Sequence, residues 1–240
     1  MIKALLLLLK AGKLGKLFLT GGTMLLSVIA YSWVFGWMYA VGFVILIFVH
    51  EMGHYIAARR RGLDVGAPTF IPFIGAWIQL KEQPHDAETE AYVGVAGPLA
   101  GTLGALACYY LARHYNSQLL LALAYAGFFL NLFNLIPISP FDGGRVTAVI
   151  SPKLWLIGVP ILIGLFFYRP SPLLILMAVL AAPQAWKAWR LMRGDLEDGE
   201  QAYYLASDET RLSYGTLYIG LAGFLAVMCH ELHQQLPRGF

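Results

Sequence analysis

The sequence predicts an all-α polytopic membrane protein with about six to seven membrane segments. Of its 240 residues, 58% are hydrophobic and only 13% are charged, and the mean hydropathy is +0.63. Residues 17–49 contain no Asp, Glu, Lys or Arg, whereas a helix needs only about 20 apolar residues to cross a bilayer. The net charge is a modest +3, and the basic residues do not cluster with aromatic ones, so the composition excludes nucleic acid as a partner.

Apolar runs place the expected helices along the chain. The first run is too long for one crossing, and we divide it at Gly36. The expected helices cover about 17–35, 38–58, 92–112, 118–136, 154–168, 171–187 and 214–232. The runs at 154–168 and 171–187 are short, so they form either a tight pair of crossings or partly re-entrant segments.

The distribution of basic residues predicts the orientation. With the N-terminus inside, only Arg113, Arg169 and Arg238 of the 17 Lys and Arg residues fall on the outer side. Cytoplasmic segments carry the excess of Lys and Arg in membrane proteins. We therefore expect an integral protein of a prokaryotic inner membrane with a cytoplasmic N-terminus.

A metal-binding pattern stands at the end of the long uncharged run. His50, Glu51 and His54 form an H-E-x-x-H motif, which puts both imidazoles on one face of a helix. Such a pair holds Zn²⁺, and the glutamate can take a proton from a metal-bound water. A carboxylate and two imidazoles beside hydrocarbon are expensive, so they indicate a functional site.

Residues 66–80 are apolar but do not read as a helix. Pro68, Pro72 and Gly75 interrupt the helical pattern, and the run 77–80 resembles a strand. We expect a small β-hairpin or re-entrant strand that dips into the membrane. The alternative is a loop that rests at the headgroups.

A catalytic zinc site needs a third protein ligand. Of the fourteen acidic residues, only Glu51, Asp142 and Glu231 lie inside or directly against apolar spans. The expected topology puts Asp142 on the same side as the histidine pair and Glu231 on the far side. The alternative for Asp142 is a locally hydrogen-bonded Asp-Gly turn, and His85 is the alternative ligand.

Four stretches together resemble the site-2 protease family of intramembrane zinc metalloproteases. They are H-E-M-G-H at 50–54, F-I-P-F-I-G-A-W-I at 70–78, A-G-P-L-A-G at 96–101 and N-L-I-P-I-S-P-F-D-G-G-R at 134–145, and the similarity covers about residues 17–150. The resemblance implies a three-helix core around one Zn²⁺ per chain. It implies that His50, His54 and Asp142 are the zinc ligands, that Glu51 is catalytic, and that Asn134 engages the substrate or the transition state.

The resemblance implies an intramembrane zinc endopeptidase that acts in regulated intramembrane proteolysis. Its partners would be the lipid bilayer and transmembrane protein substrates, whose peptide bonds it hydrolyses in or near the membrane; the oligomeric state stays open. An unwound substrate could add as a strand to the segment that contains Gly75, Ala76, Trp77, Ile78 and Gln79. The many glycines and alanines of 92–112 are expected to serve close helix packing.

Two other functions compete with this interpretation. A membrane metal transporter would have polar groups along a path across the bilayer, but here they gather at one depth. A catalytically silent membrane scaffold would not need Glu51, which is intact.

The expected organisation has three parts. Residues 1–16 form a cytoplasmic basic N-terminal segment, 17–150 form the catalytic membrane core, and 151–240 add further membrane helices with a cytoplasmic loop near 193–213.

Overall fold

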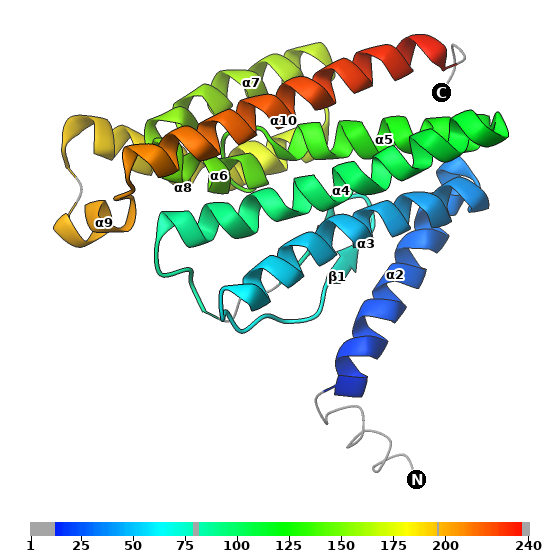
Figure 1. Cartoon of the computed structure of the whole chain (residues 1–240), viewed down its shortest axis with the longest axis horizontal. Coiled ribbons are helices and arrows are strands. Elements are labelled where there is room, and N and C mark those ends of the chain that lie inside the picture. The colour runs from blue at the N-terminus through cyan, green and yellow to red at the C-terminus, as the bar shows by residue number, and fades with distance from the viewer. Residues whose placement is uncertain (1–12, 79–81, 196, 237–240) are drawn as a thin grey trace.

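A computed structural model describes residues 13–78, 82–195 and 197–236, and helices dominate it (Figure 1). Most of the expected N-terminal segment 1–16 lies outside the described residues. The helices are α2 (Lys13–Phe35), α3 (Trp37–Arg60), α4 (Ala87–Tyr115), α5 (Gln118–Asn134), α6 (Asp142–Ile150), α7 (Trp155–Tyr168), α8 (Pro172–Arg193), α9 (Asp198–Tyr203) and α10 (Asp208–Gln235). A short turn η1 (Pro152–Leu154) precedes α7, and two strands, β1 (Thr69–Ile71) and β2 (Gly75–Trp77), lie between α3 and α4.

Seven of the described helices are apolar enough to lie in a membrane. Five of them, α2, α3, α4, α8 and α10, are also long enough to cross it, while α5 and the segment Pro152–Tyr168 are shorter. This confirms the predicted all-α membrane protein with a small β element.

Local residue chemistry sets the helix boundaries. Gly36 separates α2 from α3 with φ 82°, a backbone conformation that glycine adopts without steric penalty. The Asp86 side chain accepts a hydrogen bond from Thr89 N at 2.7 Å and so caps α4. The helix therefore begins at Ala87, earlier than the expected 92, because Glu88 and Glu90 are favourable in a first turn.

Helices α3 and α4 form the centre of the molecule. Helix α4 packs against α3 on one side and against α5 and α6 on the other. Helix α10 covers α5 and α6, whereas α2 packs on α3 and β1 and α8 packs on α7 (Figure 1). This arrangement surrounds the histidine pair of α3 with protein.

The hairpin is attached to α2. Thr20 Oγ1 donates to Pro68 O at 2.7 Å, Phe70 N donates to Thr23 Oγ1 at 3.2 Å, and Phe73 N donates to Tyr31 Oη at 3.1 Å. Strands β1 and β2 are antiparallel. The expected β-hairpin is thus confirmed, whereas its depth in the membrane stays a prediction.

The expected strand position was displaced. Strand β2 is Gly75–Trp77 and Ile78 follows it without strand structure, while Gln79 and Leu80 lie outside the described residues. The displacement follows from the turn after Ile71, where Ile74 N donates to Ile71 O and brings Gly75 opposite Ile71.

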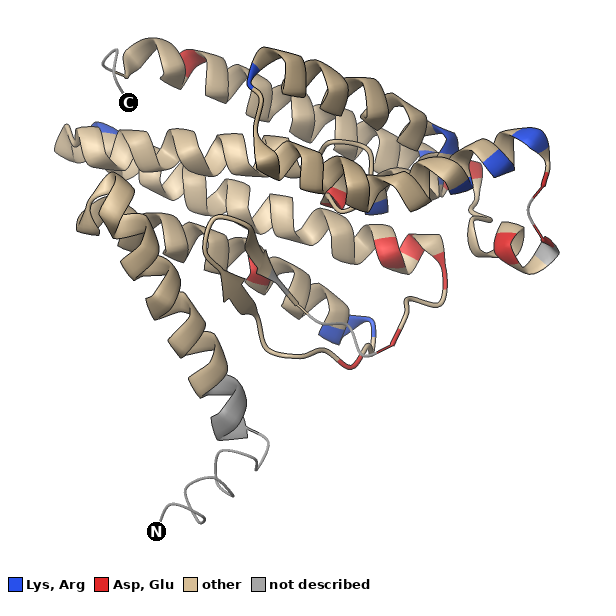
Figure 2. Ribbon diagram, turned by 180° about the vertical axis from the view of Figure 1, so that it is seen from behind, with Lys and Arg blue, Asp and Glu red and all other residues tan. Residues whose placement is uncertain are grey.

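Charged residues gather at one end of the bundle. This is the end where α3 finishes, where α4 begins and where the segment between α8 and α10 lies (Figure 2). That segment, expected as a loop near 193–213, contains α9 and the start of α10. The asymmetry accords with the charge pattern from which the orientation was predicted, and the orientation itself stays a prediction.

Candidate metal centre

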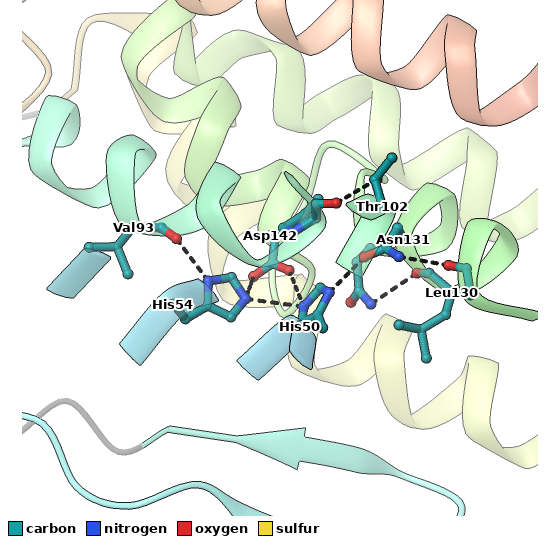
Figure 3. A network of polar contacts seen from close by, with 10 residues as sticks. His50, His54, Val93, Thr102, Leu130, Asn131 and Asp142 are labelled. Atoms are coloured by element: carbon teal, nitrogen blue, oxygen red, sulfur yellow. Dashed lines mark hydrogen bonds and ion pairs between the residues drawn. The ribbon is translucent and has the colours of Figure 1, made fainter. Parts of the chain in front are cut away.

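Three buried side chains from two helices meet beside the centre of α3. His50 and His54 lie one turn apart on α3, and Asp142 is the first residue of α6. The two Nε2 atoms are 3.1 Å apart, and the Asp142 oxygens lie 3.1 Å from His50 Nε2 and 3.2 Å from His54 Nε2 (Figure 3). Within the described residues, these three form the one group of His, Cys, Asp or Glu arranged to hold a metal ion.

Hydrogen bonds fix the tautomer of both imidazoles. His54 Nδ1 lies 2.8 Å from Val93 O, and a carbonyl only accepts, so this nitrogen carries the hydrogen. Asn131 Nδ2 donates to Gly127 O at 2.7 Å, which turns Asn131 Oδ1 toward His50 Nδ1 at 2.8 Å. His50 Nδ1 therefore also carries its hydrogen, and in the neutral rings both Nε2 atoms are bare acceptors.

These bare acceptors fit a bound cation. Two nitrogen lone pairs and a carboxylate converge within 3.1 to 3.2 Å, and no hydrogen lies between them when the imidazoles are neutral. Tetrahedral zinc with bonds of about 2.0–2.1 Å has ligand atoms roughly 3.3 Å apart. The donor set and its spacing therefore suit Zn²⁺.

The backbone around Asp142 is tightly held. Trp155 Nε1 donates to Gly144 O at 2.8 Å and Thr147 Oγ1 donates to Gly143 O at 2.7 Å. A side chain at Gly143 would collide with the Leu135 carbonyl, so only glycine allows this close approach. These contacts fix where the Asp142 carboxylate points.

The glycines of α4 make room for the side chains of the site. A Cβ added at Gly97 would overlap the His54 ring, and one at Gly101 would overlap the Asn131 amide. The role expected for these glycines was close helix packing. The backbones of α3 and α4 do approach closely, but at Gly53 of α3, which meets the Ala96 carbonyl of α4. Gly97 and Gly101 thus connect the A-G-P-L-A-G stretch directly to the candidate metal centre.

Gly97→Ala should lower zinc affinity by at least about 10-fold, the lower range seen when outer contacts of metal ligands are lost. The added methyl displaces His54 although alanine favours the helix by roughly 1 kcal/mol. Competition with a chromophoric chelator measures the affinity. Gly104→Ala is the matched control, since its Cβ meets only the flexible Leu46 and Val49 side chains at 3.2 Å or more; equal losses in both variants would contradict the assignment.

A cavity of about 1920 Å³ opens beside the three side chains. Glu51, which is 6% exposed, lines it, and so does the half-buried Asn134. Asn134 Nδ2 donates to Leu130 O at 3.0 Å. Both residues that were expected to act on substrate thus line this cavity.

Sequence reasoning missed Asn131, which contacts His50 directly. The available signal was a polar amide in an otherwise apolar helix, a feature that indicates function at membrane depth. His85, the alternative ligand, is exposed and stands outside the metal-binding group.

Comparison with known proteins gives a family match for part of the chain. Residues 38–117, which include His50, Glu51 and His54, match Peptidase family M50. Zinc metalloprotease MJ0392 of Methanocaldococcus jannaschii is 29% identical over 123 residues, covering 48% of this chain and 35% of the relative. Rip3 of Mycobacterium tuberculosis, whose name assigns it provisionally to the zinc metalloproteases, is 32% identical over 132 residues, covering 51% of this chain and 32% of the relative.

The chain spans about a third of the length of these relatives. A solved structure, the site-2 protease from Methanocaldococcus jannaschii, aligns with 20% identity and a TM-score of 0.46, covering 77% of this chain and 88% of the other.

Proposed function

We propose that this chain, which resembles the site-2 protease family and matches Peptidase family M50 over residues 38–117, is an intramembrane zinc endopeptidase. One observation carries the proposal: the ligand atoms of His50, His54 and Asp142 converge among helices that are apolar enough to lie in a membrane. When both imidazoles are neutral, no hydrogen lies between these atoms, and the Glu51 carboxylate stands beside them. We assign His50, His54 and Asp142 as the ligands of one zinc ion per chain. The named zinc metalloproteases among its relatives support this assignment.

Zinc in this position supplies a Lewis acid that activates water and polarises a peptide carbonyl. Glu51 acts as the general base, because it follows His50 on α3 and lines the same cavity. It takes the proton of the attacking water and returns it to the leaving amine. The Asn134 amide, also on the cavity wall, donates a hydrogen bond to the reacting carbonyl.

The substrate is a transmembrane segment of another protein. Residues of α2, of the hairpin, of α5 and of α8 line the cavity, among them Tyr31, Gly75, Phe133 and Met177. A helical substrate satisfies its own backbone hydrogen bonds, so it must unwind before a carbonyl reaches the site. An unwound chain needs new backbone partners inside the cavity.

Strand β2 offers such partners at Ala76. Phe70 N–H donates to Thr23 Oγ1 on α2, so it points away from β2. Opposed residues in an antiparallel pair alternate between exchanging two hydrogen bonds and none, and Phe70 opposes Ala76. The Ala76 N–H and C=O therefore point to the outer edge of β2, and Ala76 lines the cavity. We assign this edge to the substrate strand.

Ala76→Pro should reduce cleavage of a transmembrane substrate by about 10-fold or more, because proline removes the N–H that faces the substrate and none that pairs with β1. The zinc content should stay at the wild-type level. Ala76→Ser keeps the N–H and serves as the matched control. Cleavage by the proline variant at the rate of the serine variant would refute the strand-addition role.

Reconstitution tests the proposed function as a whole. The purified protein in liposomes should cut a single-span substrate, and mass spectrometry should map the cut within or beside the apolar segment. A cut confined to soluble substrates would contradict the intramembrane assignment.

We further propose that the N-terminus is cytoplasmic, in a prokaryotic inner membrane, and that the activity serves regulated intramembrane proteolysis.

A further inference from the structure

We infer that Asn131 is a positioning residue that fixes the tautomer and orientation of His50 for metal binding. The inference rests on the proposed metal centre and adds a residue to it. Asn131 lies on α5, whereas His50 lies on α3. The contact therefore links α3, which carries the histidines, to α5, the helix that precedes Asp142 and α6 along the chain.

The geometry leaves the Asn131 side chain one orientation. It is 1% exposed, its Nδ2 donates to Gly127 O at 2.7 Å, and its Oδ1 accepts from His50 Nδ1 at 2.8 Å (Figure 3). A flipped amide would place its NH₂ against the His50 N–H and its oxygen against a carbonyl. Gly101 holds the amide from the other side, because a Cβ there would overlap it.

The two asparagines of this helix differ in their contacts. Asn134 is half-buried, lines the cavity and donates to Leu130 O at 3.0 Å. Asn131 lies behind His50 and is not among the residues that line the cavity. Asn131 therefore acts through His50, whereas Asn134 borders the space for substrate.

Charge explains why an amide stands here. Metal-bound histidines commonly donate their second N–H to a carboxylate. In this site the two charges of a zinc ion are already balanced by Asp142 and Glu51, both buried. A further carboxylate would leave an uncompensated negative charge at membrane depth. An amide oxygen orients His50 without that charge, as the Val93 carbonyl does for His54.

Zinc affinity of the full-length protein in detergent tests the inference. Asn131→Leu has a similar volume but no acceptor, and its zinc affinity should fall about 10- to 100-fold, as other losses of such outer contacts do. Asn131→Asp keeps the acceptor toward His50 but adds a buried charge and sets a second oxygen against Gly127 O. Its zinc affinity should therefore lie between that of the wild type and that of Asn131→Leu. The matched control Asn134→Leu should stay within a few-fold of wild type.

The order of the two variants separates positioning from packing. A packing role predicts that leucine is tolerated and that the buried aspartate is the worse change, whereas positioning predicts the reverse. The visible absorption of the Co²⁺-loaded protein gives a second readout: it should change for Asn131→Leu and change less for Asn131→Asp.

Two outcomes are decisive in different ways. Wild-type zinc affinity in folded Asn131→Leu overturns the role of Asn131 while the metal centre stands. Absence of zinc binding by the wild type refutes the metal centre itself. If Asn131→Leu does not fold, Gly101→Ala decides in its place: it keeps the amide but displaces it, so wild-type affinity in that variant also overturns the inference.

Discussion

Glu51→Gln should lower the rate of peptide hydrolysis by at least about 100-fold, since a general base typically contributes 10²–10⁴-fold. Glutamine has the same shape as glutamate, but its amide cannot take a proton from water. Glu51 is not one of the three residues that converge on the metal position, so the zinc content should be unchanged. Cleavage of a labelled single-span substrate, measured beside zinc content, checks both expectations.

The zinc measurement is the control for this variant. Loss of cleavage together with loss of zinc would mean that Glu51 is needed for zinc binding rather than for the proton transfer. Cleavage by zinc-loaded Glu51→Gln at the wild-type rate would remove Glu51 from the mechanism and favour another base.

Asp142→Ala should remove most of the bound zinc and, with it, cleavage. The change deletes one of the three donors and leaves two neutral imidazoles whose Nε2 atoms are 3.1 Å apart. The loss in zinc affinity should exceed the 10- to 100-fold range of changes outside the ligand set. Elemental analysis of the purified protein after dialysis against a weak chelator measures it.

Asp142→Cys provides the comparison for this prediction. A thiolate is also a zinc ligand, so this variant should retain more zinc than alanine does. Full zinc content in folded Asp142→Ala would instead show that the third ligand is another residue.

Regular patterns made much of the fold predictable. Long uncharged runs predicted the membrane helices, and Gly36 marked the turn between the first two. Helical spacing predicted that His50 and His54 share a face, because residues four apart on a helix always do. Asp142 stood out since so few acidic residues lie against apolar spans.

Contacts between distant segments could not be read from such patterns. Asn131 meets His50 across 81 positions of sequence, and Val93 meets His54 across 39. Only the packing of α3, α4 and α5 against one another brings these groups together. The roles of Gly97 and Gly101 depend on the same packing. The glycine and alanine content of the helix indicated close helix packing in general, but it could not indicate which side chains these two glycines face.

The early start of α4 and the position of β2 were also unpredictable, for a different reason. The start of α4 depends on the hydrogen bond from Thr89 N to the Asp86 side chain, and the position of β2 depends on the backbone turn between Ile71 and Ile74. The apolar run indicated a helix from about 92, yet a cap and two acidic residues in the first turn begin it at Ala87.

Zinc removal and return tests the central claim most directly. The wild-type protein, reconstituted with a transmembrane substrate, is stripped of metal with a strong chelator and titrated with Zn²⁺. We predict that cleavage disappears on stripping and returns in proportion to added zinc, with saturation at one zinc per chain. Cleavage that persists in the metal-free protein, or folded protein that binds zinc but never cuts, would contradict the assignment as an intramembrane zinc endopeptidase.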